Sequence, residues 1–255
     1  MSHTATTRPT TYQTFFWGCV LALGTGLVVW AIFASVRYHW NWAAFWNYRS
    51  LVLKGWGVTV IISAGAMVLA VILAILLLLG QRCPWLPVRM LSRSYVELVR
   101  GTPLLTQLMI GYYFVANALQ INEPIPVGMV LLGSFEGAYL AEIFRGALES
   151  IGASQIEAAR AVGFDRVQIY RYVIAPQAMR RALPGAAGQM VSLIKDSSLL
   201  SVLGIEELTQ TVQIANSSTA APMEGYIPLT LIYLALTLPL SYWAKRLEER
   251  YRYET

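Results

Sequence analysis

Charged residues are scarce in this 255-residue chain. Only 13% of its residues are charged, whereas 56% are hydrophobic and the mean hydropathy is +0.51. A soluble domain usually contains about 25% charged and about 45–50% apolar residues. The composition therefore excludes an ordinary soluble enzyme and indicates an integral membrane protein.

Cysteine is almost absent, and one nucleotide-binding motif is missing altogether. Cys19 lies in an apolar run and Cys83 in a basic loop, and they show no metal-ligand spacing. Neither is expected to belong to a disulfide framework. No G-x-x-x-x-G-K-[ST] phosphate loop occurs, and glycine never precedes lysine. The absence of this motif excludes a self-contained ATPase that binds ATP through such a phosphate loop.

The net charge of +5 comes from arginines in loops between apolar runs, a pattern typical of membrane topology and not of nucleic-acid binding. Stretches of about 20 mostly apolar residues are long enough to cross a bilayer as helices. The sequence therefore predicts an all-α integral membrane protein with six transmembrane helices. These are residues 15–36, 57–80, 101–122 (beginning earlier, near Ser94), 125–144, 182–205 and 225–244.

An even number of spans puts both termini, residues 1–14 and 246–255, on one side of the membrane. Most Lys and Arg residues fall on that side, and the opposite side holds only Arg37, Arg49 and Lys54. The positive-inside rule therefore predicts cytoplasmic termini in a multi-pass protein of the cell inner membrane.

The first span and the segment after it have separate interpretations. The apolar run of residues 15–36 exceeds the ~7–15 residues of a signal-peptide core, so it is expected to be a retained additional helix. Residues 37–56 contain four tryptophans, which favour the headgroup level. They predict an extracytoplasmic interfacial segment.

A polar loop, residues 150–181, interrupts the apolar pattern and reads as two short helices. Ser154 and Glu157 have the spacing of a capping box at the start of the first helix. Gly163 is placed to close that helix in the left-handed conformation, with Phe164 as the apolar residue that follows.

The second helix of the loop is predicted to begin at Asp165, which caps it together with Gln168, and to end at Pro176. Small side chains on the first helix allow another surface to approach closely. The pattern alone leaves two readings open: a hairpin gripped by a partner, or an amphipathic hairpin that covers lipid or its own bundle.

The motif E-A-A-x-x-x-G at residues 157–163, with I-x-P at 174–176, resembles the EAA loop of ATP-binding-cassette (ABC) importer permeases. A conventional leucine before the proline is Ala175 here. The resemblance implies that the loop docks on an ATPase subunit and transmits its motion. It assigns this coupling role to Glu157, Ala158, Ala159, Gly163, Phe164, Asp165 and Pro176.

Three further segments resemble the polar amino acid uptake branch of these permeases: YVELVRGTPLLTQL (95–108), GAYLAEIFRGALESI (137–151) and LIKDSSLLSVLGIEEL (193–208). The likeness runs from about Gly55 to Arg250. Departures are Glu136, where relatives usually have a small polar residue, Gly152, where proline is common, and the additional N-terminal span.

The resemblance implies a type I importer bundle with cytoplasmic coupling helices in a permease domain of residues 57–245. It implies a permease without catalytic residues or bound cofactor, with ATP and Mg²⁺ held by a separate ATPase dimer. The other implied partners are a second permease subunit, identical or homologous, an extracytoplasmic amino-acid-binding protein and the lipid bilayer, with no nucleic acid.

Ionisable residues at bilayer depth are expensive and mark functional hypotheses. Glu136 has no basic residue one turn away on its own helix, so Lys195 is its expected partner. The pair either compensates the charges of an amino acid substrate, which favours cationic ones, or neutralises itself as a structural pair or gate. The candidate substrate pathway comprises Glu136, Tyr139, Lys195, Asp196, Ser197 and Ser198.

A second polar group lies near the expected cytoplasmic side. Glu142 and Arg145 are three residues apart and are predicted to pair on one helix face. Glu97 is expected to pair with Arg93 or Arg100, just before a proline that interrupts the helix. The candidate structural or gate residues are Glu97, Gly101, Thr102, Pro103, Glu142 and Arg145.

The sequence thus predicts the permease subunit of an ABC importer of polar amino acids, with a preference for cationic ones left open. The alternative is a secondary transporter or channel that couples ions through Glu136 and Lys195.

Overall fold

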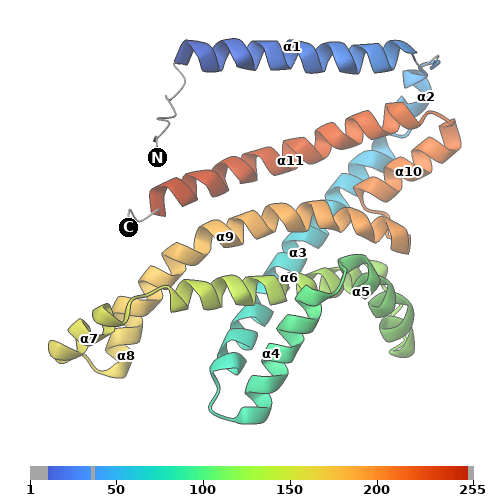
Figure 1. Ribbon diagram of the computed structural model, residues 1–255. Helices are drawn as coiled ribbons and strands as arrows, with labels where there is room; N and C mark the ends of the chain where they lie inside the picture. The colour runs from blue at the N-terminus through green and yellow to red at the C-terminus, as the bar shows by residue number, and fades with distance from the viewer. Residues whose placement is uncertain (1–10, 36–37, 252–255) are drawn as a thin grey trace, which may run out of the picture. The chain divides into compact units, whose positions relative to one another are not determined.

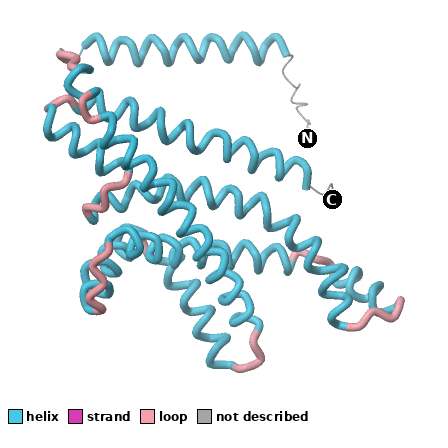
Figure 2. Tube along the Cα trace, turned by 180° about the vertical axis from the view of Figure 1, so that it is seen from behind, coloured by secondary structure: helices cyan, strands magenta, loops and turns pink. Residues whose placement is uncertain are grey.

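The computed structural model describes residues 11–35 and 38–251, and within these ranges every regular element is a helix (Figures 1 and 2). The chain divides into two compact units, Met1–Asn41 and Trp42–Thr255. In the first unit the helix α1 spans Thr11–Ser35 and overlaps the segment predicted to be an additional span. The outer parts of the predicted terminal segments, residues 1–10 and 252–255, lie outside the described ranges, as does Arg37 of the predicted interfacial segment.

The second unit begins with the short helix α2 (Trp42–Trp46) and the long helix α3 (Arg49–Arg82), which starts inside the segment predicted to be interfacial. Two further helices, α6 (Pro124–Glu149) and α11 (Pro222–Tyr251), cover the fourth and sixth predicted spans. Of the described helices, α3, α6 and α11 are long and apolar enough to cross a membrane, so the fold is that of a multi-pass bundle. The count of six spans stays a prediction.

The third predicted span is not one helix. α4 (Leu86–Gly101) ends at Thr102, and Pro103 precedes α5 (Leu104–Ile110), which continues into the π-helical stretch η1 (Gly111–Ala116). Thr102 and Pro103 both have extended backbone, as expected where proline interrupts the amide ladder. Gln107 on α5 is hydrogen-bonded to the end of α4 across this break. Its Nε2 donates to the Val99 carbonyl oxygen at 2.8 Å and to Thr102 Oγ1 at 2.8 Å.

α3 and α6 pack closely because α6 carries a G-x-x-x-G motif at Gly133 and Gly137. A Cβ atom at Gly133 would lie 2.9 Å from the carbonyl oxygen of Ala66, and one at Gly137 would lie 2.9 Å from the Leu73 side chain. Small residues at this spacing let membrane helices approach backbone to backbone. The core on one side of this contact combines α3, α4 and α6 through Ala70, Ala74, Leu77, Val96, Val99, Phe135, Ala138, Leu140 and Ala141.

The helix α10 (Leu208–Thr219) is anchored by a buried carboxylate at its start. Oε1 of Glu207 accepts a hydrogen bond from the Gln210 backbone N–H at 2.9 Å. Its Oε2 accepts from the hydroxyls of Tyr233 at 2.9 Å and Thr59 at 3.3 Å. Glu207 therefore joins α3, α10 and α11 at one point.

Residues 166–203 form one uninterrupted helical segment, named the long helical segment below. It comprises α8 (Arg166–Gln168), the π-helical stretch η2 (Ile169–Ile174), α9 (Ala175–Asp196) and the 3₁₀ helix η3 (Ser197–Leu203). The prediction that Pro176 ends a helix is wrong, since Pro176 lies in the first turn of α9. The π-helical stretch directly before it accommodates the proline ring and its missing N–H.

Candidate functional site

The polar loop forms a helical hairpin, defined here as residues 150–181. Its first helix, α7, spans Ala153–Ala161. Gly163 has a φ of +89°, as predicted, and its N–H donates to the Arg160 carbonyl oxygen at 3.0 Å. The N–H of Phe164 donates to the Ala159 carbonyl oxygen at 3.1 Å. A side chain at position 163 would therefore be held in a conformation that favours glycine.

The two predicted capping boxes of the hairpin have different outcomes. Asp165 Oδ1 accepts from the Gln168 N–H at 2.8 Å, and Gln168 Oε1 accepts from the Asp165 N–H at 2.9 Å, which confirms the second box. The first box is wrong because α7 begins at Ala153, and Gly152 caps it without a side-chain hydrogen bond. Ser154 already lies inside the first turn, so its side chain is not at the N-cap position.

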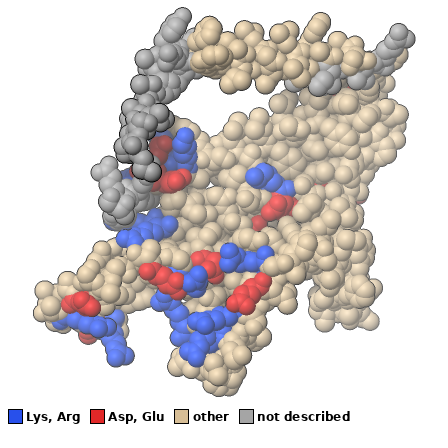
Figure 3. Space-filling view, in the orientation of Figure 1, with Lys and Arg blue, Asp and Glu red and all other residues tan. Residues whose placement is uncertain are grey.

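The outer surface of the hairpin combines charge with exposed apolar side chains. Val162 and Val167 are each 73% exposed and Phe164 is 39% exposed, whereas Ala159 is buried. Glu157 and Ala158 are also exposed. In Figure 3 most charged side chains of the visible face lie in the lower half of the view, over α4, α6, α7 and α8. The hairpin thus presents residues that are able to pack against another protein.

Glu136, which was predicted to lie at bilayer depth, contacts a different residue from the one expected. Glu136 is fully buried on α6, and its Oε2 accepts a hydrogen bond from Nε2 of Gln189 on α9 at 2.5 Å. Its Oε1 is buried without a hydrogen-bond partner among the residues that the structure describes. The predicted pairing with Lys195 is wrong, because Lys195 is exposed and no ion pair or hydrogen bond joins the two in the described residues.

Of the other candidate pathway residues, Tyr139 lies on α6, and residues 195–198 follow Gln189 along the long helical segment. Asp196 is half-buried at the end of α9. The hydroxyl of Ser197 donates to the Ile194 carbonyl oxygen at 2.8 Å, and that of Ser198 donates to the Lys195 carbonyl oxygen at 2.6 Å. Both serines therefore direct their hydroxyl hydrogens to their own helix, and Ser197 is fully buried.

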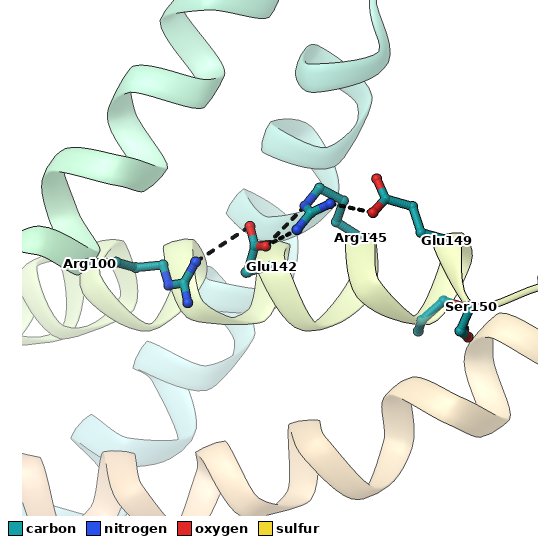
Figure 4. A network of polar contacts seen from close by, with 6 residues as sticks. Arg100, Glu142, Arg145, Glu149 and Ser150 are labelled. Atoms are coloured by element: carbon teal, nitrogen blue, oxygen red, sulfur yellow. Dashed lines mark hydrogen bonds and ion pairs between the residues drawn. The ribbon is translucent and has the colours of Figure 1, made fainter.

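A charged cluster joins α4 to α6 (Figure 4). Glu142 pairs with Arg145, as predicted, and also with Nη1 of Arg100 at 3.5 Å, while Arg145 pairs with Glu149. The Arg100 guanidinium lies 5.5 Å from the ring centroid of Tyr139. These groups border a cavity of about 300 Å³ whose lining residues are Gln81, Arg93, Val96, Glu97, Arg100, Glu142, Arg145 and Glu149.

One expectation for this cluster, the pairing of Glu97, is corrected. Arg100 pairs with Glu142, and no ion pair joins Glu97 to Arg93 or Arg100 among the described residues. Sequence spacing favoured Glu97 as the partner of Arg100 because the two residues are close in the chain. The ion pair of Arg100 forms instead with Glu142, on a helix that the fold brings next to α4. Gly101, Thr102 and Pro103 lie immediately beyond Arg100, at the break between α4 and α5.

Sequence spacing also missed two contacts within the hairpin. Gln177 Nε2 donates to Gln155 Oε1 at 2.7 Å, and Arg181 Nη1 donates to Ser150 Oγ at 2.7 Å. The partners are far apart in the chain and carry no motif, so no local signal could have paired them. Within the described residues no group of three His, Cys, Asp or Glu side chains is arranged to hold a metal ion.

Residues 66–253 match the family described as the binding-protein-dependent transport system inner membrane component. The chain belongs to this family. The glutamine transport system permease protein GlnP of Escherichia coli (strain K12) is 34% identical over 219 residues, which cover 83% of this chain and 98% of GlnP. The histidine/lysine/arginine/ornithine transport system permease protein HisQ of the same organism is 32% identical over 217 residues, covering 81% and 95%.

The crystal structure of an amino acid ABC transporter with histidines is similar to this permease with a TM-score of 0.77 and 30% identity. The similarity covers 84% of this chain and all of that one. The chain is therefore a permease subunit of an amino acid ABC transporter and has the fold of ABC importer permeases. The alternative, a secondary transporter or channel that couples ions through Glu136 and Lys195, is disfavoured because the family and its relatives are ABC transporter permeases.

Proposed function

We propose that this permease moves polar amino acids into the cytoplasm and is driven by a separate ATPase dimer that docks on the hairpin. The observation that carries the proposal is the hairpin itself. It ends its first helix with a glycine at positive φ and exposes Val162, Phe164 and Val167 beside a buried Ala159. An exposed apolar surface with a polar surround is suited to bind a protein partner.

The proposal includes an orientation and a set of partners. The hairpin and both termini lie in the cytoplasm, as the distribution of Lys and Arg suggests. A second permease subunit completes the path, and an extracytoplasmic binding protein delivers the amino acid. ATP and Mg²⁺ are bound by the ATPase, since this chain lacks the phosphate loop.

The decisive experiment is affinity purification of the tagged permease from its native membranes, with mass spectrometry and an ATPase assay. We expect a subunit with a phosphate loop to co-purify, and its ATP hydrolysis to rise when binding protein and amino acid are added. Purification of a stable permease without any ATPase would overturn the proposal.

A narrower proposal is a preference for cationic amino acids. Glu136 on α6 and Asp196 on α9 are both acidic, and Oε1 of Glu136 has no hydrogen-bond partner within residues 11–35 and 38–251. A buried carboxylate without a donor favours a nearby cation. The names of the relatives do not decide the question, because GlnP is a glutamine permease and HisQ a histidine, lysine, arginine and ornithine permease.

Glu136→Gln separates the cationic preference from a structural role, because it removes the charge and retains the shape. If the preference holds, uptake of arginine, lysine and histidine into proteoliposomes falls while glutamine uptake is retained. An equal loss for all four amino acids, or loss of assembly, would leave Glu136 with a structural role only.

A further inference from the structure

The long helical segment connects the hairpin to the polar residues at bilayer depth without an interruption. Its first residues, from Arg166, belong to the hairpin, and Gln189 and Asp196 lie further along the same segment. Twelve residues separate Gln177 from Gln189, which corresponds to about 18 Å along a helix axis. A displacement of the hairpin end therefore reaches the level of Gln189 if the hairpin is fixed to this segment.

Pro184 lies between these two points, but α9 remains helical through it. α9 also stays close to α6 at this level, because a Cβ at Gly185 would lie 3.0 Å from the Ile143 side chain. The segment is thus supported by α6 at the position where proline removes one backbone hydrogen bond.

The first bridge fixes α7 to α9. Gln177 Nε2 donates to Gln155 Oε1 at 2.7 Å, and the two residues lie on opposite arms of the hairpin. Beyond this bridge, the turn that contains Gly163 joins α7 to the long helical segment along the chain. The amide pair is therefore a specific polar contact that holds the angle between the two arms.

The second bridge fixes the end of α6 to α9. Arg181 Nη1 donates to the Ser150 carbonyl oxygen at 2.5 Å and to Ser150 Oγ at 2.7 Å. Figure 4 shows Ser150 where α6 ends, next to the charged cluster. Arg181 follows Gln177 by four residues, so both bridges extend from the same face of α9.

We propose that Gln177 and Arg181 are positioning residues that transmit movement of the hairpin to the contact between Glu136 and Gln189. This inference rests on the proposed docking of an ATPase on the hairpin. Neither residue needs to touch the ATPase or the substrate. The two bridges hold the start of the long helical segment to α7 and to the end of α6, so that the three move together.

The test uses the assembled transporter, with its co-purified ATPase and its binding protein, in proteoliposomes. The variants are Gln177→Ala, which removes the first bridge, and Arg181→Gln, which removes the guanidinium group that forms the second bridge. We expect the ATPase to remain bound and its unstimulated hydrolysis to be retained. Substrate-stimulated hydrolysis and uptake should both fall by about fivefold or more, the lower end of ordinary coupling between sites.

Two matched variants separate positioning from general damage. Arg180→Gln removes an exposed neighbouring charge that makes no hydrogen bond or ion pair with the described residues, and should behave as wild type. Gln155→Glu combined with Gln177→Lys rebuilds the first bridge as an ion pair, and should recover most of the stimulation that Gln177→Ala loses.

Normal stimulation in Gln177→Ala and Arg181→Gln would overturn the inference and leave the proposed function intact. Release of the ATPase by these variants would overturn it as well, because the bridges would then build the docking surface. An equal loss in Arg180→Gln would show a general charge effect. Absence of an ATPase from the wild-type complex would instead refute the proposed function.

Discussion

Nε2 of Gln189 lies 2.5 Å from Oε2 of Glu136, so a single hydrogen bond joins α9 to α6 where the carboxylate is fully buried. The other carboxylate oxygen has no partner. A buried carboxylate that keeps only one donor depends strongly on that donor, because its desolvation is otherwise uncompensated. Gln189 is therefore expected to stabilise the packing of α9 against α6.

Gln189→Leu should destabilise the permease by about 1–3 kcal/mol, because it removes the donor and retains the buried acid. The double variant Glu136→Leu/Gln189→Leu should recover most of that loss, since neither polar group then remains unpaired. Thermal unfolding of the purified permease in nanodiscs measures both. A midpoint for Gln189→Leu equal to that of wild type would refute the dependence.

Gly163→Val should leave the bundle folded but abolish substrate-stimulated ATP hydrolysis. A β-branched residue at a φ of +89° is strained by about 1–3 kcal/mol, and relief of this strain reshapes the hairpin. Gly163→Asn is the matched control, because asparagine tolerates the left-handed conformation better. We expect it to retain much of the stimulation in the same ATPase assay, and equal behaviour of the two variants would contradict the conformational argument.

Gly133→Ala should lower the stability of the bundle by about 1–3 kcal/mol, the usual cost of overpacking. The added Cβ would meet the Ala66 carbonyl oxygen at 2.9 Å, and a backbone atom cannot move aside as a flexible side chain can. Gly146→Ala on the same helix is the control, because no described atom beyond its chain neighbours and its own helix backbone lies within 4 Å of its Cβ position. Unfolding midpoints that fall equally for both variants would argue against the close packing of α3 and α6.

Orientation is tested by labelling single cysteines in a background in which Cys19 and Cys83 are replaced by serine. A membrane-impermeant maleimide should label Ser217→Cys from outside intact cells and should label Val167→Cys only after permeabilisation. Both positions are exposed, so accessibility to the reagent reports the side of the membrane. The opposite pattern would reverse the topology and remove the hairpin from the reach of a cytoplasmic ATPase.

Local features of the fold followed from the sequence. The left-handed glycine at position 163, the capping box of Asp165 and Gln168, the helix break before Pro103 and the pairing of Glu142 with Arg145 all form between residues a few positions apart. For such features the covalent chain itself fixes the geometry. The family motifs likewise identified an amino acid ABC permease before any contact was known.

The errors arose where a continuing helix or a distant partner decided the outcome. Ser154 lost its cap because α7 starts one residue before it, and Pro176 lost its role as a stop because a π-helical stretch precedes it. Both depend on how the neighbouring turns pack and not on residue type alone.

Composition and local spacing determined that this chain is a helical membrane protein with a capped polar hairpin, because these properties depend on hydrophobicity and on residues within one or two turns. Tertiary structure decided that Glu136 bonds Gln189 and not Lys195, that Arg100 bonds Glu142, and that Gln177 and Arg181 bridge the hairpin. The direction in which a side chain on one helix meets another depends on the rotation and crossing of both helices. Close packing at Gly133 and Gly137 fixes the rotation and crossing of α3 and α6. These two properties depend on both helices together, so neither helix sequence alone specifies them.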